Sequence, residues 1–402
     1  MKQVSVPTEE TFPTTSDAVV IGGGIVGVAT AFWLSRAGLE TLLVEMREGL
    51  STLTTPNSVE CFRAQFTEPA MAELAIPSIE IFENFADIVE IPDIDIGLHQ
   101  RGYLFVSDDP AMIDDLKAAV AKHHQLGVKD SEFLTGEEIR ERFPFVSETA
   151  VGATFREKDG WLSSHEVTQG FAQGNSARFF LKTKAIKILK DEKGVRGVET
   201  NRGVISTRTV INAAGPFAGV VAKMADVDIP VKPVRRQKAY IASKSLIPKD
   251  APMTIDLVRD SYFRPETGGA LIGWVDPEEP ESKPSEHLPT DPFFAAQTIE
   301  NLVPLFPFWE EVAADLKKPD VMTSAGQYVY TPDDQPLIGQ VAELPGFYLN
   351  CGYWAGVMLS PQAGKRVADL VTGEMKPEDN LLRPTRYDEG IVLEGSSFLR
   401  GH

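Results

Sequence analysis

The sequence predicts an α/β protein, and three observations support this fold class. The segment from 17 to 45 consists of an apolar run, a glycine turn, a helical segment and a second apolar run. The segment from 185 to 207 holds three short β-rich runs separated by turn signals, which predict an antiparallel meander. With 402 residues, 43% of them hydrophobic and 24% charged, the chain is long enough for two or three globular domains.

The first element has the pattern of a dinucleotide-binding βαβ unit. Gly22 permits a tight turn after the first strand, Gly24 lets the backbone approach a pyrophosphate, and Gly27 lets the helix pack against the strand. Residues 28–36 have helical spacing, and the free N–H groups and the positive end of the dipole at the N-terminus of this helix would face the phosphates. The turn therefore predicts a binding site for the pyrophosphate of a dinucleotide.

An acidic residue ends the second strand of this unit. Thr41–Val44 is followed by Glu45, whose carboxylate would accept hydrogen bonds from the ribose hydroxyls of the adenosine. A carboxylate at this position disfavours a 2′-phosphate, so NAD or FAD is favoured over NADP. The pattern alone does not separate NAD from FAD.

Later elements bring the chain back to the same edge of the sheet. Residues 210–216 predict an apolar strand that ends in a small-residue turn close to a bound cofactor. Residues 347–350 predict another strand, followed by a loop. Ser360 and Pro361 have the pattern of an N-cap and a first helical position, so a helix is expected to begin there and to end at Gly373.

The intervening segments predict a second set of helices and strands. The expected elements are helical structure at 67–90 with a kink at Pro77, a helix from Asp109-Pro110 to Gly127, a capping box at Thr135–Glu138, strands between 231 and 275, and an exposed loop at 277–292.

Charge and composition argue against several partners. The chain has 39 Lys and Arg against 58 Asp and Glu, a formal charge of −19, so neither nucleic acid nor a membrane surface is an expected partner. Met1–Ser16 lacks the apolar run of a signal peptide, and the cysteines are Cys61 and Cys351, so we expect a cytoplasmic protein in a reducing compartment. The histidines lack ligand spacing, so no metal site is expected.

Taken together, these segments resemble the FAD-dependent oxidoreductases of the D-amino-acid oxidase and sarcosine oxidase family. The resemblance rests on the glycine turn with Glu45, on 210–216, and on Pro233-Val-Arg-Arg-Gln237, Tyr262-Phe-Arg-Pro-Glu266, Thr331-Pro-Asp-Asp-Gln-Pro-Leu-Ile-Gly339 and the loop 352–360. The early stretch Arg63-Ala-Gln65-Phe66 makes the chain most similar to the branch of the sarcosine oxidase β-subunit, dimethylglycine dehydrogenase and proline dehydrogenase.

This resemblance implies a Rossmann-like FAD-binding domain of the three-layer, glutathione-reductase-like type. It also implies an α+β substrate domain with a mixed, mostly antiparallel sheet. The FAD-binding domain is expected at 17–90, 145–225 and 325–402, the substrate-binding domain at 91–144 and 226–324, and an N-terminal extension at 1–16. The expected cofactor-binding residues are Gly22, Gly24, Ile25, Val26, Gly27, Glu45, Met46, Arg47, Asn57, Ser58, Ala185, Ala214, Gly215, Gly326, Gly352, Gly356, Val357 and Met358.

The family resemblance implies oxidation of the C–N bond of an amino acid or N-alkyl amine of the sarcosine, dimethylglycine or proline type. A hydride would pass to flavin N5 and leave an imine, with oxygen or another redox carrier as electron acceptor. Gly326 stands near the flavin-linking Cys of monomeric sarcosine oxidase, so non-covalent FAD is expected. A homo- or hetero-oligomer remains open. The alternatives are an FAD-dependent 2-hydroxy-acid dehydrogenase and a non-catalytic or electron-relay FAD subunit of a larger complex.

The chain departs from its relatives around the substrate. Met358 stands where monomeric sarcosine oxidases carry a Lys for the substrate carboxylate, and Gln327 and Tyr328 stand near the Arg of glycine and D-amino-acid oxidases. Leu271 replaces the lysine implicated in oxygen activation. Oxygen is therefore not favoured as the acceptor.

Five residues remain as candidates for substrate contact. Arg63 and Arg264 could clamp a carboxylate bidentately, and Tyr262, Tyr328 and Trp354 could wall the substrate pocket. Each has a structural alternative: a structural ion pair for Arg63, pairing with Glu266 for Arg264, and packing for the aromatic rings.

Overall fold

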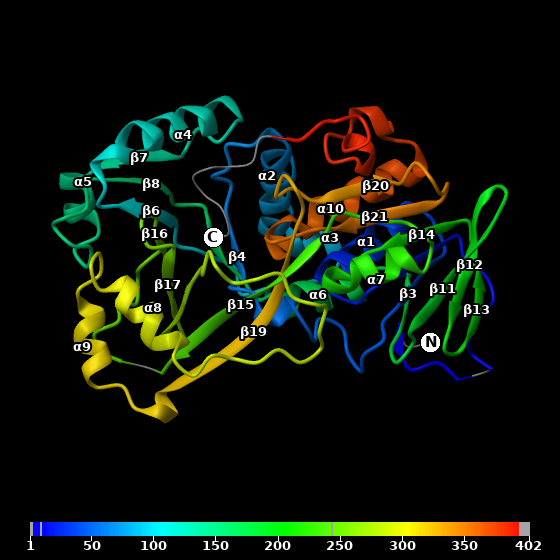
Figure 1. Ribbon diagram of the computed structural model, residues 1–402, viewed down its shortest axis with the longest axis horizontal. Helices are drawn as coiled ribbons and strands as arrows, with labels where there is room; N and C mark the ends of the chain where they lie inside the picture. Colours follow the sequence, from blue (N-terminus) through cyan, green and yellow to red (C-terminus); the bar gives the residue numbers. More distant parts are fainter. Residues whose placement is uncertain (1–2, 9, 243, 394–402) are drawn as a thin grey trace.

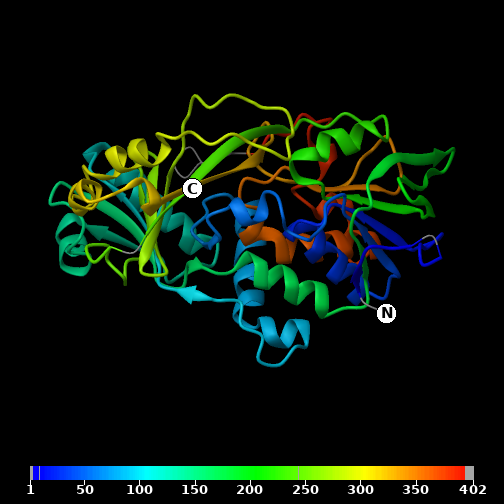
Figure 2. The same cartoon turned by 90° about the horizontal axis from the view of Figure 1, so that it is seen from below.

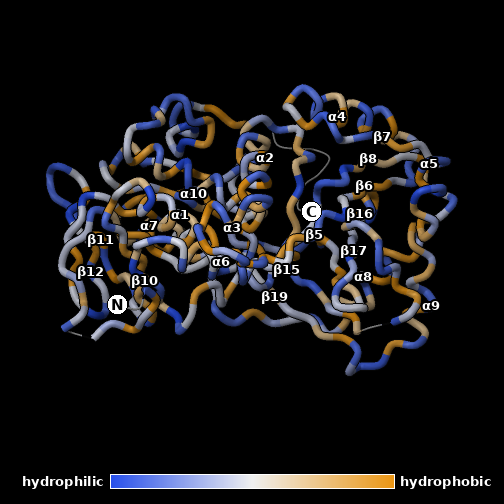
Figure 3. Tube along the Cα trace, turned by 180° about the vertical axis from the view of Figure 1, so that it is seen from behind, coloured by the Kyte–Doolittle hydropathy of each residue, from blue (hydrophilic) through white to orange (hydrophobic). Residues whose placement is uncertain are grey.

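The computed structural model describes residues 3–8, 10–242 and 244–393. Two large sheets lie side by side and define two halves of the molecule (Figure 1). Hydrophobic residues concentrate where the elements pack, and hydrophilic residues follow the outer loops (Figure 3). Within the described ranges, none of the helices combines the length and the apolar character needed to cross a bilayer.

The first sheet has seven strands and is parallel except at one edge. In spatial order the strands are β1 (Val4–Ser5), β10 (Arg178–Phe180), β3 (Thr41–Val44), β2 (Ala18–Ile21), β14 (Thr209–Asn212), β21 (Phe347–Cys351) and the antiparallel β20 (Leu337–Gln340). Alternate side chains of each strand point to opposite faces. Ala18 and Val20 pack against helices on one face, whereas Val19 and Ile21 pack into a different layer on the other.

These two faces give the first domain three layers, as the sequence predicts. The helical layer holds α1 (Ile25–Arg36), α2 (Pro69–Glu83), α3 (Phe85–Val89), α6 (Ser164–Gln173) and α10 (Gly356–Thr372). The opposite layer holds the antiparallel meander β11 (Ala185–Asp191), β12 (Gly194–Thr200) and β13 (Gly203–Ser206), together with α7 (Ala218–Lys223).

The second sheet has eight strands and is antiparallel except between β16 and β6. Its spatial order is β19 (Val321–Tyr330), β15 (Lys232–Ile241), β18 (Gly269–Trp274), β17 (Ser261–Glu266), β16 (Met253–Asp256), β6 (Tyr103–Ser107), β8 (Gly152–Arg156) and β7 (Glu132–Thr135). Helices α5 (Gly136–Arg142), α8 (Phe294–Leu302) and α9 (Phe308–Ala314) supply residues to the core on one face, and α4 (Ile113–Gln125) to a cluster that includes Tyr103 and Tyr262. This is the mixed, mostly antiparallel sheet that the family resemblance implies.

Short elements complete the chain. A small sheet joins β4 (Cys61–Phe62), β9 (Gly160–Trp161) and β5 (His99–Gln100). The 3₁₀ turns are η1 (Thr55–Asn57), η2 (Pro110–Met112), η3 (Gly215–Phe217), η4 (Lys318–Asp320), η5 (Pro377–Asp379) and η6 (Pro384–Arg386). The capping box predicted at Thr135 is present at the start of α5.

The strand pairing corrects three of the expected domain boundaries. β8 falls inside the segment 145–225 assigned to the first domain, yet it pairs with β6 and β7 of the second sheet. The expected boundary at residue 325 cuts through β19, which pairs with β15 along its whole length. The expected extension 1–16 contributes β1 to the first sheet. Pairing between distant strands decides these limits, and local sequence patterns do not contain it.

The last helix begins earlier than the sequence predicts. Helix α10 starts at Gly356 and contains Pro361 in its interior, so the predicted N-cap at Ser360 is wrong. A proline has no N–H to donate to the carbonyl four residues before it, which here belongs to Val357. The Ser360 hydroxyl donates to that oxygen at 3.0 Å and replaces the missing donor. The helix ends before Gly373, which is left-handed, as the sequence predicts.

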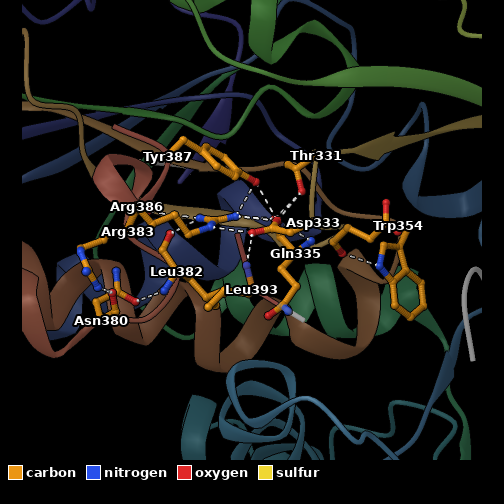
Figure 4. Close-up of polar contacts among 11 residues, drawn as sticks. Thr331, Asp333, Gln335, Trp354, Asn380, Leu382, Arg383, Arg386, Tyr387 and Leu393 are labelled. Carbon is orange, nitrogen blue, oxygen red and sulfur yellow. Dashed lines mark hydrogen bonds and ion pairs between the residues drawn. The ribbon is translucent and has the colours of Figure 1, made fainter. Parts of the chain in front are cut away.

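A buried ion pair fastens the C-terminal segment to the loop after β19. The Arg386 guanidinium donates two hydrogen bonds of 2.9 Å to the Asp333 carboxylate, and both side chains are fully buried (Figure 4). The Tyr387 hydroxyl and the Gln335 backbone N–H donate to the same carboxylate at 2.7 and 3.2 Å. Burial acts to raise the pKa of Asp333, but the hydrogen bonds and the positive charge of Arg386 hold it below its usual value. We call these four residues the clasp.

Removing one partner of the clasp should destabilise the fold. Arg386→Leu leaves the Asp333 carboxylate buried without its cation, so we expect a loss of about 3–5 kcal/mol in the free energy of unfolding, measured in urea. The double variant with Asp333→Leu should recover much of this loss. Breaking the exposed Arg101–Asp250 pair with Arg101→Leu should leave the urea midpoint nearly unchanged. An Arg386→Leu midpoint equal to that of the wild type would contradict this account.

Candidate cofactor and substrate site

A cavity of about 500 Å³ lies at the carboxyl ends of β2, β3 and β14. Its walls include the glycine turn after β2, the chain after β3, the turn after β14, and the residues around the start of α10. The second domain adds residues of β19 and of the coil that follows β18. The carboxyl edge of a parallel sheet is where doubly wound α/β proteins bind their ligands, so this cavity is the candidate cofactor site.

The glycines of the turn have two different physical roles. Gly22 has φ +114°, and a Cβ there would lie 2.5 Å from the Ala213 oxygen. A Cβ on Gly27 would lie 1.9 Å from the Gly22 oxygen, so packing of the chain itself requires glycine at both positions. A Cβ on Gly24 would meet nothing nearer than the Thr55 hydroxyl at 3.5 Å. Glycine at 24 therefore keeps the cavity open.

Two helix N-termini meet at the cavity. The first turns of α1, at Ile25 and Val26, and of α10, at Gly356 and Val357, both line it. Unsatisfied N–H groups and the positive end of each helix dipole favour an anion or developing negative charge in this space. The donors thus suit a pyrophosphate at one end and an electron-accepting ring at the other.

Glu45 follows β3, which is separated by β2 and β14 from β21, the strand before α10. Its carboxylate accepts hydrogen bonds from the backbone N–H groups of Gly23, at 2.6 Å, and Arg47, at 2.7 Å. Burial raises the pKa of Glu45, and the two hydrogen bonds offset part of the rise. The apolar side chains of Val220 and Met224 also line the cavity, and Val220 is 44% exposed. A carboxylate beside an apolar wall suits a ribose joined to a flat base.

A loop of the first domain is held in place from the second sheet. The Thr55 hydroxyl accepts a hydrogen bond from the Ile25 N–H at 3.3 Å. Lys238, on β15, donates to the backbone oxygens of Pro56 at 2.9 Å and Ser58 at 2.6 Å. Lys238 is almost fully buried, and burial lowers its pKa to about 8. A single lysine therefore fixes the loop that supports the start of α1.

The structure places most of the expected cofactor-binding residues in the cavity wall. These are Gly22, Gly24, Ile25, Val26, Glu45, Met46, Arg47, Ser58, Ala185, Ala214, Gly215, Gly356 and Val357. The residues that lie outside the wall are Gly27, Asn57, Gly326, Gly352 and Met358.

Packing explains the residues outside the wall. A Cβ on Gly326 would lie 3.0 Å from the Asn57 Cβ, so this glycine makes room for the loop. A Cβ on Gly352, which has φ +82°, would lie 2.7 Å from the Thr331 side chain. Met358 is buried in the core of the helical layer.

Arg63 lies in a cage of aromatic rings. Its guanidinium carbon is 4.7 Å from the ring centre of Phe66, 5.0 Å from that of Phe105, 5.5 Å from that of Trp354 and 5.7 Å from that of Tyr103. The side chain is fully buried, and Trp354 lines the cavity, so Arg63 lies directly behind this wall. Four rings near one guanidinium stabilise its charge where water does not.

Arg264 has the partner that the sequence left as its alternative. It forms ion pairs with Glu266, on the same strand, and with Glu60 at 3.8 Å, and it donates to the Val59 oxygen at 3.1 Å. Its guanidinium also lies 5.3 Å from the ring centre of Trp161. These contacts neutralise and orient Arg264, which makes a structural role its better-supported assignment.

Of the three aromatic candidates, Tyr328 and Trp354 line the cavity and Tyr262 lies outside its wall. The Trp354 indole donates to the Asp334 oxygen at 2.8 Å, so the loop that carries the clasp also fixes this ring (Figure 4). Burial raises the pKa of both tyrosines well above the usual range, which keeps their hydroxyls neutral.

Sequence reasoning missed several wall residues. Thr55 and the other residues of the polar stretch 51–55 follow the Glu45 strand end, a position that could have drawn attention to them. Lys283, Pro284 and Glu286 come from the predicted exposed loop, and no local signal connects them with the first domain. Among the described residues, no three His, Cys, Asp or Glu side chains gather in a way that could hold a metal ion.

Comparison with known proteins identifies the family. The sequence model of the family described as FAD dependent oxidoreductase (DAO) matches residues 17–370. The chain belongs to this family. It is 24% identical over 409 residues to mitochondrial dimethylglycine dehydrogenase of Rattus norvegicus, which covers 98% of this chain and 47% of the rat protein. It is 27% identical over 376 residues to mitochondrial sarcosine dehydrogenase of Homo sapiens, with coverages of 89% and 40%.

The chain thus spans less than half the length of these two relatives. A solved L-proline dehydrogenase from P. horikoshii is 26% identical, has a TM-score of 0.83, and covers 96% of this chain and 100% of its own. A glycine oxidase from Bacillus cereus, 23% identical with a TM-score of 0.76 and coverages of 96% and 100%, shares the fold.

FAD is the cofactor of this family, and the cavity fits it. The space at Gly24 is open although the packing of the chain does not require glycine there, and a Cβ on Gly215 would likewise meet no atom within 4 Å beyond its chain neighbours. The turn from Gly22 to Val26 would hold the pyrophosphate, Glu45 the ribose, and the first turn of α10 the flavin ring.

The two classes of glycine should respond differently to substitution. Gly24→Ala should leave the apoprotein within about 1 kcal/mol of the wild type in urea unfolding but weaken FAD binding at least ~10-fold, because its Cβ enters the open space. Gly27→Ala should destabilise the apoprotein itself by about 1–3 kcal/mol or more, because its Cβ meets the Gly22 oxygen. Equal unfolding free energies for the two variants would contradict this division.

Burial of Lys238 should make stability depend on pH. Its pKa is about 8 in the folded protein and about 10.4 in an unfolded chain, so the unfolded state binds more protons between these values. The free energy of unfolding should therefore rise from about pH 8 to pH 10 through this group. In Lys238→Met that part of the rise should be absent, as measured by urea unfolding of both proteins across the window. Parallel pH profiles of the unfolding free energy in the two proteins would contradict a lowered pKa of Lys238.

Proposed function

We propose that this protein oxidises the C–N bond of an amino acid or N-alkyl amine of the sarcosine, dimethylglycine or proline type, with non-covalently bound FAD. The relatives described above carry names that specify dimethylglycine, sarcosine and L-proline as substrates. The observation that carries the proposal is the buried cation of Arg63 behind Trp354, at the cavity end that contains the first turn of α10. When bound, FAD supplies a hydride acceptor at N5.

Arg63 has the chemistry for a carboxylate clamp. A guanidinium presents two parallel donors to a carboxylate, and a desolvated pair of this kind is stronger than one in water. The cage of Phe66, Tyr103, Phe105 and Trp354 limits the orientation of the side chain. A substrate carboxylate bound by Arg63 would hold the carbon next to nitrogen in a fixed place, which is the main requirement of a hydride transfer.

The remaining wall residues support the same reaction. Tyr328 and Trp354 provide a neutral aromatic surface, which suits an amine that must be uncharged when its hydride leaves. The N–H groups at the start of α10 would stabilise negative charge without a protonated base. Among the described residues that line the cavity none is histidine, the residue that oxidation of a 2-hydroxy acid would use as a base.

We propose a redox carrier, in preference to oxygen, as the electron acceptor. Leu271, at the position of the lysine implicated in oxygen activation, is fully buried in an apolar cluster with Tyr262 and Ile255. An apolar side chain supplies no positive charge to stabilise reduced oxygen species.

Anaerobic reduction tests the substrate class. The FAD-loaded protein is mixed with sarcosine, dimethylglycine, L-proline and D-amino acids, and the flavin absorbance is followed. We expect bleaching by at least one N-alkyl amino acid or proline, and none by the corresponding 2-hydroxy acids. Bleaching by none of the amines would overturn the proposal.

Arg63→Met tests the clamp. Loss of a bidentate, buried contact should weaken apparent substrate affinity by about 10- to 10²-fold, because a hydrogen bond to a charged group contributes about 1.5–3 kcal/mol. FAD binding, measured by flavin fluorescence, should change little. Arg264→Met is the matched comparison: it should lower stability in urea through the loss of its ion pairs, with a smaller effect on substrate affinity. An unchanged affinity in Arg63→Met would exclude the clamp.

A further inference from the structure

The coil between β18 and α8 crosses from the second domain to the cofactor cavity. The sequence predicts residues 277–292 to be an exposed loop, but Lys283, Pro284 and Glu286 are part of the cavity wall. Figure 2 shows this yellow-green coil passing between the two halves of the molecule. We call residues 277–292 the strap. It brings a piece of the second domain to a site that otherwise belongs mostly to the first.

Side chains of β15 hold both ends of the strap. Arg235 donates to the two carboxylate oxygens of Glu279, at 2.9 and 3.0 Å, and to the Pro289 oxygen at 2.9 Å. The Asp291 N–H donates to the Gln237 side chain at 2.7 Å. The ends of the strap are therefore fixed to the second sheet.

One buried side chain fixes the middle of the strap. Gln327, on β19, is 1% exposed. Its amide nitrogen donates to the Ser282 hydroxyl at 2.7 Å and the Lys283 oxygen at 2.8 Å, and its amide oxygen accepts from the Ser285 N–H at 3.0 Å. Related oxidases carry a substrate-binding Arg near this position. In this chain Gln327 stands there and anchors the strap.

The strap contacts the first domain through a partly exposed ion pair. Arg47, which follows the ribose-side Glu45, forms an ion pair of 2.6 Å with Glu286. The two side chains are 26% and 44% exposed, so water and salt weaken their attraction. Arg47 also donates to the Thr52 hydroxyl at 2.9 Å, which keeps its guanidinium in place when Glu286 moves away. The pair can therefore break without the loss of a buried hydrogen bond.

We propose that the part of the strap that carries Glu286 is a movable wall of the FAD cavity, with Gln327 as its anchor and the Arg47–Glu286 ion pair as its latch. The strands and helix starts that form the other walls are fixed by buried packing, whereas the latch is a half-exposed ion pair that opens at little cost. Opening of the latch sets the rate at which FAD leaves, and ionic strength controls that rate.

The test measures FAD release from the loaded protein after dilution, by the rise in free flavin fluorescence. Glu286→Gln should release FAD about two to five times faster than the wild type, the range for losing a partly exposed ion pair. Raising ionic strength should speed release from the wild type and have much less effect on Glu286→Gln. Arg47→Met should behave similarly, and the double variant should be no faster than either single variant.

Controls separate the latch from a general effect of charge. Asp250→Asn removes an acid of the exposed Arg101–Asp250 pair, which lies outside the cavity wall, and should leave the release rate unchanged. Wild-type rates in both single latch variants, or a double variant whose effect is the product of the two, would overturn the latch.

Hydrogen exchange gives an independent reading that needs no variant. Within the strap, the Ser285 N–H donates a hydrogen bond to the Gln327 side chain of β19. If bound FAD holds the strap closed, a peptide covering 281–288 should exchange its amide hydrogens more slowly with FAD bound than without it. Equal exchange in the two states would overturn the strap as a cofactor wall. These measurements use no amine substrate, so their failure leaves the proposed oxidation standing, and a failed substrate test leaves the strap standing.

Discussion

The ten-residue antiparallel ladder between β15 and β19 is the constraint on which the site depends. Residues paired directly across such a ladder share a face of the sheet. Arg235 and its partner Gln327 both hold the strap, whereas Lys238 and Gly326 both lie against the loop at 54–58 of the first domain. One pair of strands thus places opposite faces against two different walls of the cavity. Where β19 ends, the chain runs directly into the loop that carries the clasp, and the Asp334 oxygen of this loop fixes the Trp354 ring.

Local sequence patterns predicted the parts of the fold that local physics determines. The turn from Gly22 to Gly27 and the strand ending at Glu45 follow from sterics and alternation within a few residues. The start of α10 could not be predicted in this way, because a Ser-Pro pair occurs both at an N-cap and inside a helix. The Ser360 hydroxyl decides between them by satisfying the Val357 carbonyl, and only the structure shows that bond. The predicted domain limits were wrong for a similar reason, because β8 belongs to the second sheet only through its pairing with other strands.

The contrast between local patterns and distant contacts also applies to the site. Residues on the glycine turn could be named from sequence because the spacing of the glycines is itself a local pattern. Lys238 and Glu286 could not, because each acts on a partner nearly two hundred residues or more away in the chain. For the two arginines the outcome depended on distance along the chain. Arg264 has an acidic partner two residues later, whereas the four rings around Arg63 come from three separate segments, two of them far away in the chain.

Buried bonds across the two halves have a mechanical consequence. Lys238 reaches the backbone at 56 and 58, Arg264 reaches Val59, and Gln65 donates to the Tyr103 oxygen at 3.0 Å. Separating the halves as hinged bodies would expose or orphan each of these groups, at roughly 1–3 kcal/mol apiece. We therefore expect the two sheets to move as a single frame, with the surface coils as the parts that can open. Such a frame would hold the two sheets at a constant separation, while its coils alone respond to the surrounding solution.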